Sequence, residues 1–171
     1  MLYVSATQVG AIAPFNLSAP ATNIQVTYNG QTSSAFTMPV VSAAPSVYSI
    51  NGTGGGYGIL NQDGSVNTSV NTASVGSVVT FYATGFGQTS PASLDGTVTS
   101  VLPYPVPLQP VTVAIDGQPA EVVYAGAAPS QPAGIMQVNA VVPANAYGYN
   151  LPVLLSVGNV ASPNILQLSV Q

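Results

Sequence analysis

The 171 residues include no lysine, arginine, histidine or cysteine, and each of these absences removes a class of function. Nucleic-acid binding depends on Lys and Arg side chains that neutralise phosphates, so we expect no nucleic-acid partner. Histidine and cysteine supply most general bases, nucleophiles and transition-metal ligands in proteins. We therefore expect no catalytic residue, no metal site and no cofactor, and we predict that the protein is not an enzyme.

Charge of either sign is scarce, because Asp63, Asp95, Asp116 and Glu121 are the only charged side chains and the net charge is −4. No apolar run reaches the roughly 18 residues of a membrane span, so we expect no membrane insertion. Without cysteine, redox chemistry does not indicate the compartment. The chain offers no cleavage site to trypsin-like proteases, and its Ser, Thr, Asn and Gly content is typical of secreted β proteins. These features favour an extracellular or cell-surface location.

The hydrophobic content of 47% is enough to fill a core, and it is arranged in short alternating segments. Two of them, Ile24–Tyr28 and Val111–Ile115, end in Asn29-Gly30 and Asp116-Gly117, which are typical of type I′ hairpins. Further strands are expected at Gln8–Ala13, Ser34–Val41, Ser77–Ala83, Ala120–Tyr124, Ile135–Val142, Leu151–Val157 and Ile165–Val170. No segment shows a capped helical repeat, so the predicted class is all-β, an Ig-like β-sandwich.

The chain contains an internal repeat. Gln8–Pro14 matches Gln137–Pro143, and Tyr3 precedes the first copy as Tyr124 precedes the second. The match continues with Val26–Gly30 against Leu154–Gly158 and with Ser34–Met38 against Ser162–Leu166. Repeats of this kind mark repeated structural modules. We therefore predict that residues 1–41 are the C-terminal half of an Ig-like domain and that residues 42–171 form a complete Ig-like domain.

Several segments resemble the Solibacter-type uncharacterised C-terminal domain family, whose members end large secreted bacterial proteins. The segments are Leu2–Ser5 with Gln8-Val9, Ala44-Pro45, Leu60–Asn67, Gly76–Gly87, Val113–Pro129 and Gly134–Asn139. The resemblance implies an Ig-like fold and a secreted bacterial location, and it implies no catalytic residue, because the family has no assigned activity. In that family the Leu-Tyr-Val segment follows upstream strands that these 171 residues do not contain.

Half a sandwich exposes an apolar face and unpaired strand edges, which favour pairing with another chain. We expect an extracellular structural protein, a self-assembling filament or surface fibre held by strand pairing and apolar packing. Its main partner would be itself, in a head-to-tail homopolymer. Two alternatives stay open: the chain is a fragment, or the half-domain folds back on its neighbour. The residues expected at the inter-subunit contact are Leu2, Val4, Val9, Ile12, Ile165, Leu166, Leu168 and Val170.

The alternative function is that of a carbohydrate-binding or adhesion module of a larger secreted protein, with surface glycans as partners. Aromatic rings can stack on sugars, and the chain has nine tyrosines. Those expected in loops, and hence in a sugar platform, are Tyr57, Tyr104, Tyr147 and Tyr149.

The acidic residues suggest chemistry only weakly. Asp63 could bind calcium together with Asn61 and Asn67, but one carboxylate is few for such a site, and an Asx-turn explains Asp63 better. Asp116 and Glu121 lie five residues apart across the expected turn and could be considered as a glycosidase pair, but Asp116 is already explained by its Asp-Gly turn and nothing around them suggests a substrate cleft.

Overall fold

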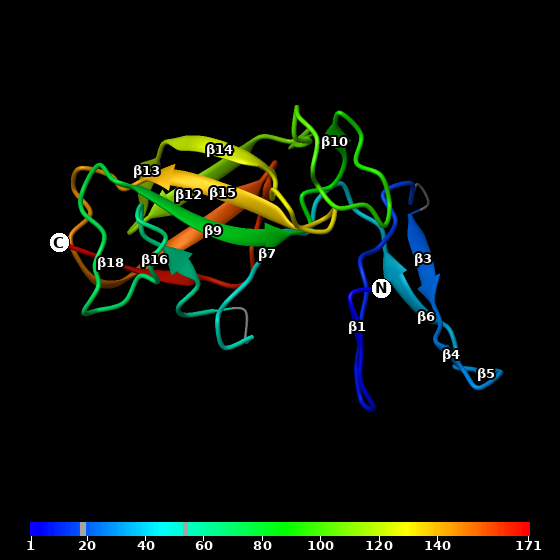
Figure 1. Cartoon of the computed structure of the whole chain (residues 1–171). Coiled ribbons are helices and arrows are strands. Elements are labelled where there is room, and N and C mark those ends of the chain that lie inside the picture. Colours follow the sequence, from blue (N-terminus) through cyan, green and yellow to red (C-terminus); the bar gives the residue numbers. More distant parts are fainter. Residues whose placement is uncertain (18–19, 53–54) are drawn as a thin grey trace. The chain divides into compact units, whose positions relative to one another are not determined.

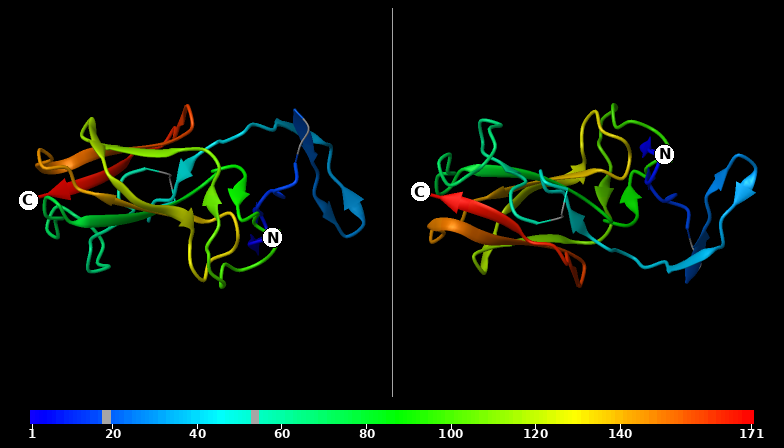
Figure 2. Two further views of the ribbon diagram at one scale, coloured as in Figure 1. Left: turned by 90° about the horizontal axis from the view of Figure 1, so that it is seen from above. Right: turned by 90° about the horizontal axis from the view of Figure 1, so that it is seen from below.

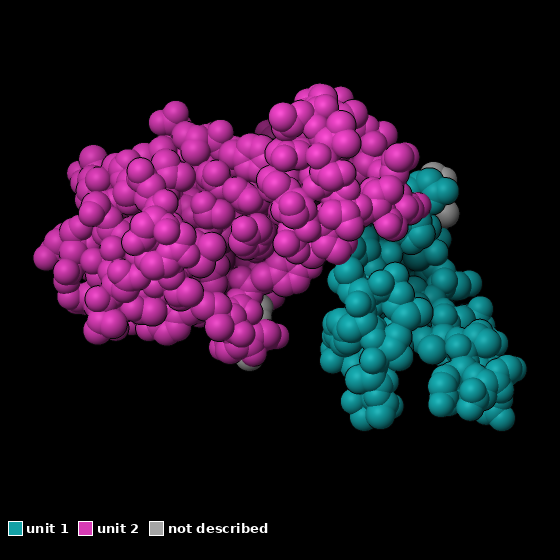
Figure 3. Space-filling model, in the orientation of Figure 1, with its two compact units in different colours: residues 1–42 teal, residues 43–171 magenta. Residues whose placement is uncertain are grey.

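This computed structural model describes residues 1–17, 20–52 and 55–171 (Figure 1). The described residues form strands, turns and loops and contain no helix, which confirms the all-β prediction. Accordingly, this part of the chain has no helix that is long and apolar enough to cross a membrane. The chain divides into two compact units, Met1–Ser42 (unit 1) and Ala43–Gln171 (unit 2), which Figure 3 colours separately. Each unit is described by itself.

Unit 2 contains two antiparallel sheets of five strands each, stacked as two layers (Figures 1 and 2). The strand β9 lies within the first sheet, between β15 on one side and β7 and β8 on the other. The strands of this sheet are β14 (Val122–Ala127), β15 (Met136–Val141), β9 (Val78–Thr84), β7 (Ser46–Val47) and β8 (Ile59–Leu60).

The second sheet is built around β16, which pairs with β12 along one edge and with β17 and β18 along the other. A separate short ribbon joins β10 (Thr89–Ser90) to β11 (Val106–Pro107). The strands of the second sheet are β13 (Gln118–Ala120), β12 (Val111–Ile115), β16 (Gly148–Val157), β17 (Val160–Ala161) and β18 (Leu166–Val170).

The core of unit 2 lies between the two sheets. Every second residue of β9 and of β15 is buried, as a sheet with one inward face requires. The largest fully buried side chains come from both layers, with Phe81, Val79 and Val138 from the first sheet and Ile115, Leu155, Leu166 and Leu168 from the second. Two sheets that share one core in this way form a β-sandwich.

The two predicted type I′ hairpins are confirmed. Asn29 and Gly30 have φ angles of 48° and 75°, and Asp116 and Gly117 have φ angles of 51° and 73°. Positive φ at both central residues defines this turn, and Asn, Asp and Gly adopt it at low cost. The first turn connects β4 to β5, and the second connects β12 to β13.

Unit 1 consists of two antiparallel ribbons. The first pairs β1 (Tyr3–Val4) with β2 (Val9–Gly10). The second pairs β3 with β6 and, further along, β4 with β5. Figure 3 shows the two ribbons as two separate prongs. The bounds in the second ribbon are Ala21–Ile24 for β3, Thr27–Tyr28 for β4, Gln31–Thr32 for β5 and Phe36–Pro39 for β6.

One strand of unit 1 differs from the sequence prediction. The expected strand Ile24–Tyr28 is interrupted, because the backbone N–H of Val26 donates to the Ser33 hydroxyl at 3.1 Å and so leaves the regular ladder. The expected buried face is also missing, since Ile24, Val26 and Tyr28 are all exposed. The alternation fits a sandwich strand, but no second layer covers it within unit 1.

Candidate assembly surface

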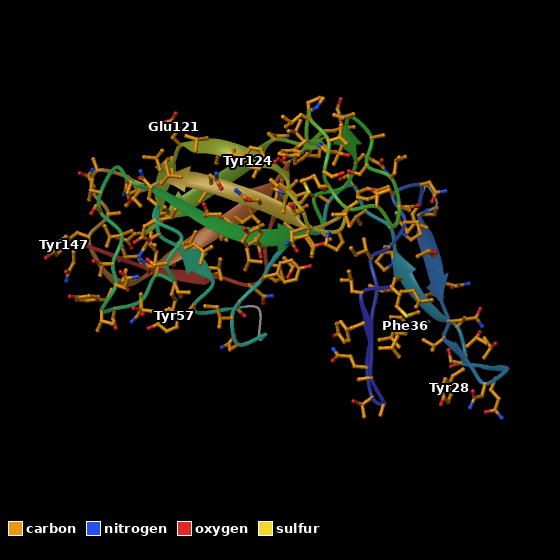
Figure 4. The ribbon with its side chains drawn as sticks, in the orientation of Figure 1. Tyr28, Phe36, Tyr57, Glu121, Tyr124 and Tyr147 are labelled. Atoms are coloured by element: carbon orange, nitrogen blue, oxygen red, sulfur yellow. The ribbon has the colours of Figure 1, made fainter. Side chains whose placement is uncertain are left out.

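Unit 1 presents large apolar side chains to solvent along its second ribbon. Phe36 is 67% exposed and Ile24 is 47% exposed, and Val26, Tyr28 and Met38 are exposed as well. Figure 4 shows Phe36 and Tyr28 as sticks on this ribbon. The four charged side chains of the protein all lie beyond residue 42, so unit 1 has none. Unit 1 therefore carries no charged side chain, and large apolar side chains lie exposed along its second ribbon.

Each strand of unit 1 that the structure describes pairs with one other strand and has an open edge on its other side. Within the described residues, β2 pairs only with β1, and β3 pairs only with β6. Unpaired N–H and C=O groups along a strand edge can form a ladder with another strand. The open edges and the apolar side chains together make unit 1 the candidate assembly surface.

The residues predicted at an inter-subunit contact fall into two groups. Leu2, Val4 and Val9 are exposed, Ile12 is partly exposed, and all four belong to unit 1. In the terminal segment only Ile165 is exposed, at 45%.

The predictions for Leu166, Leu168 and Val170 are wrong for this chain, because each is fully buried in the core of unit 2. The reason is that β18 pairs with β16 and turns its apolar side chains toward the other sheet. The sequence shows that these residues favour burial, but it does not show that unit 2 itself buries them.

The four tyrosines of the predicted sugar platform lie in three separate places. Tyr57 follows Gly56, which pairs with Leu166 at the start of β18. The Tyr149 hydroxyl accepts a hydrogen bond from the Gln171 side chain, beyond the end of β18. Tyr57 is thus placed beside the start of β18, and Tyr149 is placed beside its end.

The remaining two tyrosines, Tyr147 and Tyr104, do not join Tyr57 and Tyr149 into one surface. Tyr147 is 74% exposed and lies two residues from Tyr149. Tyr104 belongs to the segment whose Pro105 carbonyl accepts from the Ala127 N–H of β14, in the other sheet. Figure 4 shows Tyr57 and Tyr147 at different places on unit 2. The four rings thus do not form one platform.

The Asx-turn interpretation of Asp63 is confirmed. Its Oδ1 accepts hydrogen bonds from the Ser65 N–H at 2.9 Å and from the Ser65 hydroxyl at 2.5 Å. These bonds stabilise the carboxylate and hold the pKa of Asp63 below its usual value. Asn67 instead bonds to Asn61 and Ser169, so the oxygens considered for calcium are used within the fold.

The described residues contain no group of three or more acidic side chains that could hold a metal ion. Asp116 occupies the β12–β13 turn with positive φ, as its Asp-Gly sequence predicts. Glu121 lies between β13 and β14 and is exposed (Figure 4).

Comparison of the chain with family models, with curated proteins and with solved structures gives no match. The resemblance to the Solibacter-type domain therefore stays a prediction from the sequence. The functional proposal below is therefore based on the exposed apolar side chains and open strand edges of unit 1.

Proposed function

We propose that this protein is an extracellular structural protein that joins neighbouring polypeptides by strand addition at unit 1. The observation that supports the proposal is the exposed apolar ribbon of unit 1 together with the open edges of its strands. Strand addition would pair the edge N–H and C=O groups and remove the apolar side chains from water at the same time. Both effects favour a stable junction.

One form of such an assembly is the head-to-tail homopolymer expected from the sequence, and a junction with a different polypeptide is the other. Contact between different patches of identical subunits continues indefinitely unless it closes into a ring. The scarcity of charge suits this form, because a net charge of −4 over 171 residues opposes self-association only weakly.

Sedimentation velocity of the full chain over a concentration series tests assembly between copies. The homopolymer predicts that the average mass rises above that of one chain and that filaments are visible by negative-stain microscopy. Phe36→Asp should return the mass to that of one chain, because a carboxylate would have to be buried at the junction. Thr37→Asp is the matched control, since it adds the same charge at the next residue, where the side chain already bonds to Asn23.

A mass of one chain at every concentration would contradict the homopolymer. Equal masses for the Phe36 and Thr37 variants would show that assembly does not use this face of the ribbon. Circular dichroism of both variants shows whether unit 2 keeps its fold in each case.

A further inference from the structure

The first ribbon of unit 1 has the same register as a ribbon of unit 2. The repeat Gln8–Pro14 supplies β2, and its counterpart Gln137–Pro143 supplies β15. The paired residues are Tyr3 with Gly10 and Val4 with Val9 in unit 1, and Tyr124 with Asn139 and Ala125 with Val138 in unit 2. The β1–β2 ribbon is therefore the equivalent of the β14–β15 ribbon, residue by residue.

The second ribbon of unit 1 matches β16, β17 and β18 of unit 2. The Ser33 N–H donates to the Val26 carbonyl at 2.9 Å, and the Ser162 N–H donates to the Leu155 carbonyl at 2.8 Å. Further along, Ile24 lies opposite Phe36 and Thr22 opposite Met38, as Val153 lies opposite Leu166 and Leu151 opposite Leu168.

This register corrects the sequence alignment by one residue at Val26–Gly30 and by two residues at Phe36 and Met38. Val26 is equivalent to Leu155, whereas the sequence comparison set it against Leu154. The difference arises from the strand pairs that flank the two hairpin turns. Tyr28 pairs with Gln31 and Val157 pairs with Val160, so the turn residues Asn29-Gly30 are equivalent to Gly158-Asn159. The sequence suggests that Gly30 matches Gly158, but in the structure Asn29 is the residue equivalent to Gly158.

In unit 2 both ribbons are completed by strands from residues 43–120. The strand β9 pairs with β15 and sets Phe81 opposite Val138. The strand β12 pairs with β16 and sets Ile115 opposite Val153. The counterparts of Val138 and Val153 in unit 1 are Val9 and Ile24, and within the described chain no strand pairs with them on that side.

Apolar side chains of unit 1 are far more exposed to solvent than the equivalent side chains of unit 2. Ile24 is 47% exposed, whereas the equivalent Val153 is 1% exposed. Phe36 is 67% exposed, whereas the equivalent Leu166 is fully buried. Met38 is 43% exposed against 0% for Leu168. The apolar pattern of unit 1 is thus that of a sandwich interior without its other half.

We infer that unit 1 binds the N-terminal half of a sandwich of this same repeat, a polypeptide segment with the strand pattern of residues 43–120. Its β9-like strand would pair with the open edge of β2, and its β12-like strand with the open edge of β3. The inference rests on the proposed function in that unit 1 is the joining surface. It adds the identity of the segment that joins there.

The absence of charge on both surfaces supports this half-domain as the occupant. The side chains that β9 and β12 turn inward, among them Val79, Phe81, Val113 and Ile115, are apolar and buried in unit 2. Unit 1 has no charged side chain, so contact between these two surfaces would bury no charge.

A second copy of the chain does not offer this segment freely. Its residues 43–120 are already paired with its own β15 and β16. Transfer of that segment to unit 1 of another chain would expose one C-terminal half in order to cover another. The apolar area removed from water would then be nearly unchanged, so the occupant is a half-domain that is not otherwise engaged.

Hydrogen exchange of the full chain tests the inference, with a polypeptide of residues 43–120 as the probe. We expect backbone exchange in β2 and β3 to slow by about tenfold or more when the probe is added, because ladder formation at their open edges protects these N–H groups. Exchange in β15 to β18 reports any displacement of the chain's own segment. In a second form of the test, a flexible linker joins the probe to Met1, which removes any limit set by the solubility of the probe.

Two matched variants locate the contact. Ile24→Asp should weaken probe binding by about tenfold or more, because Ile24 occupies the inward position of the ribbon. Asn23→Asp adds the same charge to the adjacent residue, whose side chain accepts a bond from Thr37 on the other face, and it should leave binding unchanged.

Unchanged exchange of unit 1 in both forms of the test would overturn the inference. If the full chain then still assembles through Phe36, a second copy is the occupant and the proposed function stands. If the full chain also keeps the mass of one chain, both proposals fail.

Discussion

The buried side chain of Asn67 connects two distant parts of unit 2. It is 1% exposed, its amide donates to Asn61 Oδ1 and to the Ser169 carbonyl, and its Oδ1 accepts from the Ser169 N–H at 2.8 Å. These bonds connect positions 102 residues apart and hold the loop before β9 against β18. The sequence suggests an Asx-rich loop here, but a partner so distant along the chain leaves no local signal.

Tyr124 gives a residue-scale prediction of pH dependence. Burial, with a smaller contribution from Tyr104, raises the pKa of Tyr124 above its ordinary value of about 10. The folded state therefore favours the neutral phenol, whose hydroxyl donates to the Ala127 carbonyl at 2.7 Å. This contribution to stability is complete below the unfolded pKa and is lost as the pH rises through the folded pKa.

We therefore expect the thermal unfolding temperature to fall above about pH 10, and to fall less steeply in Tyr124→Phe. Calorimetry across the alkaline range measures both slopes. Parallel slopes for the Tyr124 variant and the parent would contradict the role of Tyr124 burial.

At the scale of elements, the sequence predicts the turns better than it predicts which strands pack against each other. Asn29-Gly30 and Asp116-Gly117 specify their hairpins locally, because the required positive φ angles suit these residues. In contrast, the apolar pattern of Leu166–Val170 predicts a strand but not which neighbour buries it. The interruption at Val26 depends on the Ser33 hydroxyl, seven residues away, and the alternation of the strand gives no sign of it.

The entry of the chain into unit 2 depends on Gly85. Its φ is +80°, and a Cβ at this position would lie 1.9 Å from the Ala44 carbonyl oxygen. Gly64 has a similar φ of +81° and nothing within 4 Å of such a Cβ. Both substitutions to alanine cost the strain of positive φ, about 1 kcal/mol, but only the one at Gly85 adds a clash with backbone.

We therefore expect Gly85→Ala to lower the free energy of unfolding by well over the roughly 1 kcal/mol of Gly64→Ala. Urea denaturation followed by circular dichroism measures both values. Equal losses would mean that the close approach of Ala44 to Gly85 does not constrain the fold.

At the scale of the whole molecule, the two units differ in how far the described strands cover their apolar side chains. The sequence indicates the all-β class, and the repeat indicates that residues 1–41 correspond to the end of residues 42–171. What the sequence leaves undetermined is burial, because Ile24 and Val153 have the same apolar character and differ only in whether another strand covers them.

Limited proteolysis should distinguish the two units. Chymotrypsin cleaves after aromatic residues, and we expect the first cuts after Tyr28 and Phe36, because the short ribbons of unit 1 open easily. The expected product is a persistent fragment that contains unit 2, identified by mass spectrometry. Early cleavage within β9 or β16 would contradict this order. Trypsin has no Lys or Arg to cut after and serves as the control.

The two ends of unit 2 leave the sandwich in opposite directions along its strands. The chain enters beside Gly85, past the end of β9, where the Ala44 N–H donates to the Gly85 carbonyl at 2.8 Å. It leaves after β18, where the Gln171 N–H donates to the carbonyl of Ala73, before the start of β9. Ladder hydrogen bonds in antiparallel sheets run perpendicular to the strands. Tension applied between these ends would therefore load the β18–β16 bonds in shear, all together, and unit 2 would resist stretching better than a hairpin that opens one bond at a time.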